Sequence, residues 1–280
     1  MKNLLFSLVL IFITSVSFSQ VSQSEKSALI DIYNSTNGEN WTNSWDLSSD
    51  VESWYGVTVE ENSVVKLNLT MNNLSGKLPK SISKLYNLKS IDLGFNKING
   101  EIPNEITQLT KLESIKLFMN RFEGSIPSDI GNLVSLKEFV IYNNAIGGTI
   151  PESLYNLKNL NTLHISSNNF SGTLNHQIAQ LSNLKVLSLF DNSFFGELPK
   201  EIGLLLNLTE LTIANNLFEG EIPLELNKLA NLEMLLLSNN RFNGKISSSI
   251  TSLPKLSYFE YNNNPKDIDI MSNPVSQTNM

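Results

Sequence analysis

The chain has 280 residues, 41% of them hydrophobic and only 17% charged, and its formal net charge is −7. This length suits one large domain or two small ones. The acidic balance argues against a nucleic-acid partner or an anionic membrane held by a basic face. The absence of cysteine excludes disulfides, thiolate metal sites and thiol nucleophiles.

Residues 1–19 have the composition of a secretory signal peptide. Residues 1–3 supply a short positive start, residues 4–16 are an almost uninterrupted apolar run, and residues 17–19 place serines at the −3 and −1 positions of a cleavage site. The run is shorter than the ~20 apolar residues of a membrane-spanning helix. We therefore expect an exported protein, secreted or at the cell surface, without a transmembrane segment.

Residues 20–63 lack the periodicity of the remaining chain and are predicted to form an N-terminal cap. Residues 25–33 have the apolar spacing of a helix, and residues 54–59 (WYGVTV) are expected to form a strand. Trp41, Trp45 and Trp54 are expected to pack on the first repeat, because a terminal cap must cover the end of the core. The alternative is that these tryptophans contact a ligand.

Residues 64–264 repeat with a period of twenty-four, in nine units of which the last is incomplete. One glycine column runs from Gly76 to Gly244, and one apolar column from Leu67 to Phe259. Several columns held in register over about two hundred residues identify a solenoid. An asparagine occupies the same place in every unit: Asn72, Asn96, Asn120, Asn144, Asn168, Asn192, Asn216, Asn240 and Asn264.

Each unit contains the elements of one solenoid coil, as residues 112–127 (LESIKLFMNRFEGSIP) show. Alternating apolar residues predict a short strand with one buried side, and stacked copies pair these strands in parallel. The asparagine amide is expected to bond backbone groups where the chain leaves the strand. The fold class is therefore an α/β repeat solenoid, with a parallel β-sheet on the concave face and short helical or 3-10 turns on the convex face.

The consensus L-x-x-L-x-L-x-x-N-x-L-x-G-x-I-P resembles the plant-specific leucine-rich repeats of receptor-like kinases and polygalacturonase-inhibiting proteins. In that family cysteines usually flank the W-x-G-V element of the N-terminal cap, and Ser53 and Val59 stand there in this chain. The short signal with no cysteine is similar to bacterial secreted members. Asn175 and Ser247 replace the proline of the consensus, so looser turns are expected there. The resemblance implies a ligand-binding module, although this fold carries many different ligands.

Outward positions of the strands define the predicted binding surface, centred on repeats two to six. Large apolar groups left in water usually mark a contact surface, and aromatics are enriched at binding hot spots. The alternative is a ladder of side chains that only stabilises the sheet. The predicted ligand contacts are Phe95, Lys116, Phe118, Met119, Tyr142, His164, Phe190 and Asp191.

No enzyme motif occurs in the sequence, and we expect neither catalytic residues nor a cofactor. Two histidines, His164 and His176, fall on different faces of the repeat, and no histidine or cysteine pair suits a metal. The predicted partner is a protein or a carbohydrate bound on the concave face. Alternatives are an inhibitor of a polysaccharide-degrading enzyme and a protein that binds ice or another regular surface; the ice-binding function would require a column of identical hydroxyl residues, which is absent.

The repeat pattern fails at its C-terminal end. The apolar column that includes Phe242 continues at Lys266, and the tail at residues 265–280 contains no recognisable cap. An exposed edge of a parallel sheet invites pairing with another chain. The sequence therefore suggests a homodimer formed through this strand edge.

Overall fold

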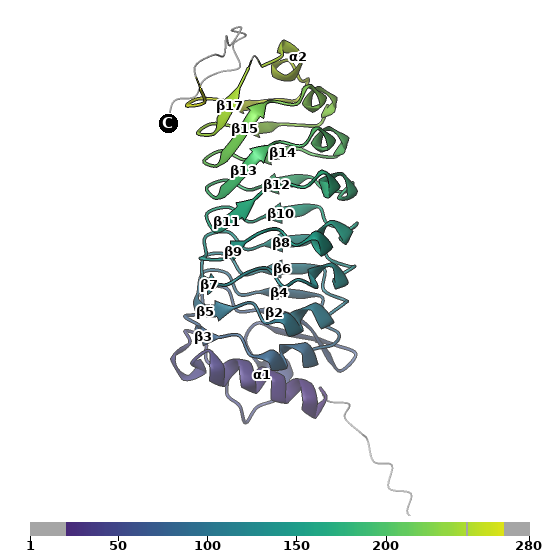
Figure 1. Cartoon of the computed structure of the whole chain (residues 1–280). Coiled ribbons are helices and arrows are strands. Elements are labelled where there is room, and N and C mark those ends of the chain that lie inside the picture. The colour runs from purple at the N-terminus through teal and green to yellow at the C-terminus, as the bar shows by residue number, and fades with distance from the viewer. Residues whose placement is uncertain (1–20, 245, 266–280) are drawn as a thin grey trace, which may run out of the picture.

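The protein is described here by a computed structural model, which covers residues 21–244 and 246–265. The predicted signal peptide and almost all of the predicted tail lie outside the described residues. Within them, the chain winds into one column of stacked coils, each made by one repeat (Figure 1). The predicted leucine-rich-repeat solenoid is confirmed.

One ten-stranded sheet runs along the concave face of the column. Its first two strands are antiparallel, and every later strand pairs in parallel with the equivalent residues of its neighbours. Leu163, for example, lies opposite Phe139 and Leu187, the equivalent residues of the repeats on either side. The strands are β1 (Val57–Glu60), β2 (Ser63–Asn68), β4 (Ser90–Asp92), β6 (Ser114–Lys116), β8 (Glu138–Val140), β10 (Thr162–His164), β12 (Val186–Ser188), β14 (Glu210–Thr212), β16 (Met234–Leu236) and β18 (Tyr258–Glu260).

Two shorter sheets follow the asparagines, on the side of the column where each coil turns away from the concave face. Their strands are β3 (Ser75–Lys77), β5 (Lys97–Glu101) and β7 (Arg121–Glu123), then β9 (Gly147–Gly148), β11 (Asn169–Gly172), β13 (Ser193–Glu197), β15 (Leu217–Glu221) and β17 (Arg241–Asn243).

Short helical turns complete the coils on the convex face. In the described part of the chain, seven of these turns are 3-10 helices and the last is α-helical, and two further 3-10 helices lie in the cap. They are η1 (Gly38–Asn40), η2 (Val51–Ser53), η3 (Lys80–Lys84), η4 (Asn104–Gln108), η5 (Ile130–Asn132), η6 (Glu152–Asn156), η7 (His176–Gln180), η8 (Lys200–Leu204), η9 (Leu224–Lys228) and α2 (Ser248–Thr251).

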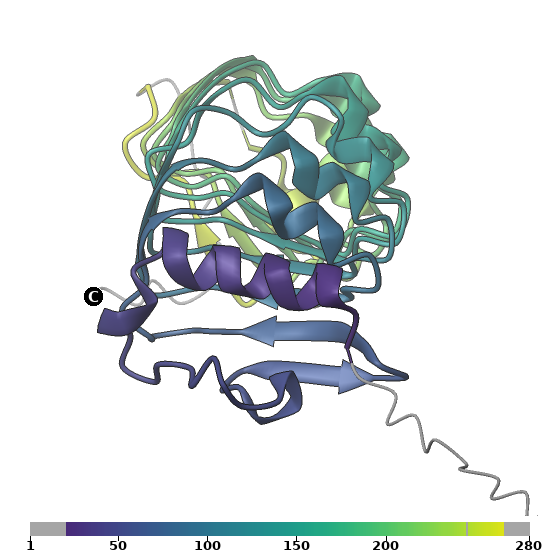
Figure 2. The same ribbon diagram turned by 90° about the horizontal axis from the view of Figure 1, so that it is seen from below.

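A cap built on α1 (Gln23–Ser35) closes the N-terminal end of the column (Figure 2). Buried Glu25 joins it to the first repeat, because one carboxylate oxygen accepts a hydrogen bond from the Val64 amide at 3.1 Å. The side chains of Trp41, Trp45 and Trp54 are buried and contact one another, which leaves little of them for a ligand. Gly56 has a φ of 76°, so the strand expected at residues 54–59 begins only at Val57.

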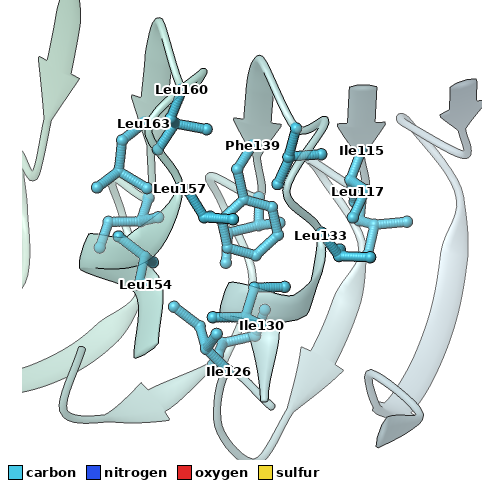
Figure 3. Packing of buried hydrophobic residues seen from close by; sticks show 14 of the residues in the cluster. Ile115, Leu117, Ile126, Ile130, Leu133, Phe139, Leu154, Leu157, Leu160 and Leu163 are labelled. Carbon is cyan, nitrogen blue, oxygen red and sulfur yellow. The ribbon is translucent and has the colours of Figure 1, made fainter. Parts of the chain in front are cut away.

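The core consists of apolar columns that continue from one coil to the next (Figure 3). Strand residues such as Ile115 and Leu163 meet leucines from the convex turns, and both are almost completely buried. A row of phenylalanines from Phe170 to Phe242 stacks inside the C-terminal half with centroids 6.1–6.3 Å apart. Removing one such side chain typically lowers the free energy of unfolding by about 3–5 kcal/mol.

The asparagine column links each coil to the one before it. The Nδ2 of Asn120 donates to the Leu117 carbonyl at 3.1 Å and to the Leu93 carbonyl at 2.8 Å, and its Oδ1 accepts from the Ile98 amide at 3.0 Å. Backbone groups that the turn leaves without partners are satisfied in this way. Asn72, in the first repeat, makes the corresponding bonds to Asn43 of the cap.

Two repeats replace the consensus proline without the looser turn that the sequence suggested. Asn175 and Ser247 keep the extended backbone, with φ values of −74° and −67°. Each side chain instead accepts a hydrogen bond from the amide two residues later, at 2.9 and 3.3 Å. A side-chain cap of this kind satisfies a free amide at the start of the turn and holds it in place.

Candidate ligand-binding surface

Four aromatic side chains from successive repeats form one continuous group on the concave face, here called the aromatic stack: Phe95, Phe118, Tyr142 and His164. Phe95 meets Phe118 edge to face, with centroids 5.2 Å apart. Phe118 and Tyr142 are parallel within 13° at 4.9 Å, and Tyr142 and His164 within 23° at 4.4 Å. Phe118 and Tyr142 take equivalent places of successive repeats, whereas Phe95 lies one place later in its repeat and His164 two places earlier in its own. The parallel register aligns the middle pair, and the lengths of the side chains bring the outer two rings into contact with it.

Gly94 provides the space that lets the stack form, a role that the sequence alone did not reveal. A Cβ at this position would lie 2.5–2.8 Å from three atoms of the Phe118 ring. Phe118 therefore lies across the backbone of the preceding repeat, where it reaches Phe95. The sequence signal is a glycine at an outward position between Thr70 and Phe118.

Stacking determines which parts of the rings remain open. Tyr142 has a ring against each of its faces, so its edge and hydroxyl are what a ligand can reach. Ring edges carry partial positive charge, and they suit carbonyl and carboxylate oxygens better than the C–H faces of a sugar. Burial lowers the pKa of His164 and raises the pKa of Tyr142, which Asp92 raises further. At neutral pH the stack is therefore uncharged.

Lys116 forms an ion pair with Glu138 on the adjacent strand of the same sheet. Its Nζ lies 2.9 Å from a carboxylate oxygen of Glu138, which also accepts from the Ser114 hydroxyl at 2.8 Å. Burial works to raise the pKa of Glu138, but these two hydrogen bonds outweigh it and hold the pKa below its usual range. The pair adds a polar, nearly neutral border beside the stack.

Phe190 and Asp191 lie beyond the end of the aromatic stack. Among the described residues, no ring contact joins Phe190 to His164, because Ser166 occupies the intervening outward position. A buried hydroxyl ladder begins there: Ser166 and Ser188 are 2.7 Å apart, and Ser188 and Thr212 are 2.6 Å apart. The structure thus brings four of the five predicted aromatic contacts together in the aromatic stack. It places the fifth, Phe190, and its neighbour Asp191 apart from the stack.

The residue before each column asparagine has a left-handed backbone in all nine repeats, with φ between 48° and 58°. This conformation costs most residues roughly 1–2 kcal/mol, and asparagine and aspartate tolerate it best. Repeats four to nine carry Asn, Ser or Asp at this place, whereas the first three carry Met71, Phe95 and Met119. We call these three residues the apolar rim; Met71 was not among the predicted contacts.

The described residues were searched for clusters of metal ligands and for membrane-spanning helices. No group of three or more metal-ligating side chains occurs among them. None of the helices in the described part of the chain has the length and apolar character needed to span a bilayer.

Family models of leucine-rich repeats match most of the column. A leucine-rich-repeat region matches residues 64–177, and a leucine-rich-repeat model matches residues 183–205, 207–229 and 231–253. The chain therefore belongs to the leucine-rich-repeat proteins. No curated protein matches the chain.

Solved structures place these repeats with the plant type. The ectodomain of the Arabidopsis thaliana receptor kinase GASSHO1/SCHENGEN3, in complex with CASPARIAN STRIP INTEGRITY FACTOR 2, has 34% identity and a TM-score of 0.82 over 86% of this chain and 30% of that one. The Arabidopsis receptor kinase HAESA, in complex with the peptide hormone IDA and the co-receptor SERK1, has 31% identity and a TM-score of 0.80 over 87% and 42%.

Similarity is not confined to plant receptors. A leucine-rich-repeat protein of Leptospira interrogans has 33% identity and a TM-score of 0.59 over 70% of this chain and 48% of that one. A plant ice-binding protein shares the fold alone, at 21% identity and a TM-score of 0.53 over 81% and 89%. The chain spans 30–42% of the length of the receptor chains that it matches.

Proposed function

We propose that this protein is an exported recognition module that binds a polypeptide on its concave face, with the aromatic stack at the centre of the contact. The observation that carries this proposal is the continuous group of aromatic rings from Phe95 to His164. These side chains are partly exposed and lie on the outer side of the sheet, away from the core. Exposed aromatic clusters of this kind are typical of binding hot spots. The complex of HAESA with the peptide hormone IDA supports the same class of partner.

A polypeptide suits the stack better than a glycan does. Sugar rings bind aromatic residues through open ring faces, and Tyr142 has none. Its edge and hydroxyl, with the imidazole of His164, offer donors and partial positive charge to backbone carbonyls. A glycan remains the second candidate only at Phe95, whose side chain is 46% exposed.

The test is a parallel screen of the purified protein against a displayed random-peptide library and a glycan array. We expect selected peptides whose affinity falls at least tenfold in the Phe118→Ala/Tyr142→Ala double variant, because each ring stabilises the other. A Ser188→Ala/Thr212→Ala variant, altered in the buried hydroxyl ladder, is the matched control. Glycan hits that need Phe118 and Tyr142, without any peptide hits, would replace a polypeptide partner by a carbohydrate.

Inhibition of a polysaccharide-degrading enzyme is a special case of this proposal, since the bound polypeptide would be an enzyme surface. It is supported only by the resemblance of the repeats. Ice binding requires a long regular hydroxyl array, and the hydroxyl ladder contains three members, each at most 5% exposed. The concave face therefore favours the polypeptide.

Three further parts of the proposal concern the working context of the module. The apolar start of the sequence supports export to the outside of a cell, as in bacterial secreted members. Repeat proteins that bind peptides support a function without catalysis or cofactor.

Dimerisation through β18, the last strand of the concave sheet in the described part of the chain, stays a prediction, to be tested by the mass of the protein in light scattering.

A further inference from the structure

The apolar rim is not explained by folding. Met71 is 69% exposed and Phe95 46% exposed, so neither side chain contributes much to the core. Their left-handed backbone disfavours large apolar residues, and six equivalent repeats use Asn, Ser or Asp instead. Strained, exposed residues that bring no stability to the fold are grounds for a functional hypothesis.

An open hollow of about 310 Å³ lies along this rim. Its lining comes from three sources: Thr42 of the cap, Met71 and Asn73 of the first repeat, and Phe95, Asn96 and Lys97 of the second. This volume is at the lower end of the range for small-ligand sites. The hollow therefore suits one large side chain, and the flexible methionine can adapt to its shape.

The charged residue that lines the hollow is a cation, and the carboxylates on the same side of these strands, Glu101 and Glu123, lie further along them. Lys97 lines it, and Arg121 takes the equivalent place in the next repeat, on the strand that pairs with β5. Both side chains are exposed, and neither forms an ion pair within the described residues; the Nζ of Lys97 donates to Asn73 Oδ1 at 2.8 Å. One such cation in the lining of the hollow, and a second in the equivalent place of the next repeat, are complementary to an apolar group followed by an acid.

We propose that the apolar rim binds a large apolar side chain of a polypeptide ligand and that Lys97 and Arg121 bind an acidic residue next to it. The proposal rests on the proposed function, because the contact between Phe95 and Phe118 makes the rim continuous with the aromatic stack. The ligand then enters at the cap end of the column and continues along the stack toward His164.

Methionine methyl groups are built-in reporters for this site. The chain has six methionines, of which Met71 and Met119 belong to the rim and Met234 lies on the concave sheet seven repeats from the first. In the purified protein with ¹³C-labelled methionine methyls, N-acetyl-leucyl-aspartyl amide should shift the Met71 and Met119 signals and leave Met234 unchanged. The leucyl-lysyl amide should bind at least tenfold more weakly, and the seryl-aspartyl amide should not bind.

The Met71→Asn variant separates binding from folding, since asparagine is the residue that other repeats use at this place. We expect at least a tenfold loss of leucyl-aspartyl amide affinity, read at Met119, with an unchanged or higher melting temperature. A lower melting temperature would make Met71 a structural residue and overturn the proposal. Equal shifts from the seryl-aspartyl amide, or an equal response of Met234, would overturn it as well.

The two proposals can fail separately. Library peptides that require Tyr142 but bind the Met71→Asn variant normally would overturn the rim site and leave the concave site standing. Dipeptide binding at the rim, with no library peptide that depends on Phe118 and Tyr142, would support the rim site and overturn the proposed function of the stack.

Discussion

Repeats one to four and repeats six to nine share one structural frame but differ on their concave surfaces. Leu67 and Leu235, in equivalent places, are both fully buried, and the column asparagines bond in the same way throughout. On the concave side, however, the early repeats carry the aromatic stack and the apolar rim. The late repeats carry the hydroxyl ladder and paired asparagines, among which Phe190, Met234, Leu236 and Tyr258 lie without a ring contact on this face in the described part of the chain. The repeat frame thus fixes the interior and leaves the outward positions free to differ.

The late repeats satisfy their own polar groups. The hydroxyls of Ser188 and Thr212 bond each other, and the Nδ2 groups of Asn239 and Asn263 donate to the preceding asparagine side chains at 2.5 and 2.7 Å. In the early repeats Met71 is 69% exposed, and Phe95 is still 46% exposed although its ring meets Phe118. Binding is assigned to the early half because, within the described residues, the ring contacts on the concave face all lie there and join the exposed aromatic groups into one surface.

The largest expected effect concerns the asparagine column, which the two halves of the molecule share. Asn96→Ala and Asn216→Ala should each lower the free energy of unfolding by about 3 kcal/mol, because several buried backbone groups lose their partner. The free energy of unfolding is measured by urea denaturation, monitored by circular dichroism. A loss confined to one half would show that the two halves do not share one structural frame.

The next effect is specific to the early half. Gly94→Ala should weaken binding of library-selected peptides about tenfold, or ~1.4 kcal/mol, because the new Cβ displaces the Phe118 ring. Calorimetric titration measures the affinity. Gly94 has no left-handed φ, so alanine fits the backbone there, and wild-type affinity in the variant would mean that the position of Phe118 is unimportant.

Exchanging residues at the left-handed position should change stability by about 1 kcal/mol in opposite directions. Met71→Asn raises the free energy of unfolding, and Asn143→Met, at the equivalent place of the fourth repeat, lowers it. Melting temperatures should move by roughly 2–4 °C each way. Changes of the same sign would show that side-chain contacts, and not backbone strain, decide stability at this place.

The smallest effect concerns pH. Burial in the stack lowers the pKa of His164, so below the ordinary pKa of about 6.5 the unfolded chain takes up a proton that the folded chain resists. Stability should therefore fall as pH drops from 7.5 to 5.5, and His164→Phe should flatten this slope in melting experiments. His176→Gln, altered at an exposed position, is the control; an unchanged slope in His164→Phe would contradict the assignment.

The fold could be predicted from the sequence because each repeat contains the residues that define its own coil, and this pattern occurs nine times. The constant period identifies strand, turn and core positions without any knowledge of long-range contacts. The outward residues are also identified by the register, which is how Phe118 and Tyr142 become candidates. Only the outline of the cap could be predicted, since it has a single copy: Val57 starts a strand that the sequence placed three residues earlier.

Side-chain partners, by contrast, depend on the distance between neighbouring coils. The ion pair of Lys116 with Glu138 and the space above Gly94 arise from contacts between residues of successive repeats. The exposed strain at Met71 depends on a φ of 56°, which a methionine in the sequence does not indicate. These features decide what the surface can bind, and the structure was needed to find them.

The uniform stacking of the coils has a consequence for how such a surface can evolve. Each coil contacts mainly its neighbours, and one repeat adds about one strand spacing, ~4.8 Å, to the column. Duplication or deletion of one whole repeat between the stack and the hydroxyl ladder would change their separation by that step and keep the interior intact. Gene rearrangement could therefore match this protein to longer or shorter ligands in discrete increments, without redesign of either end.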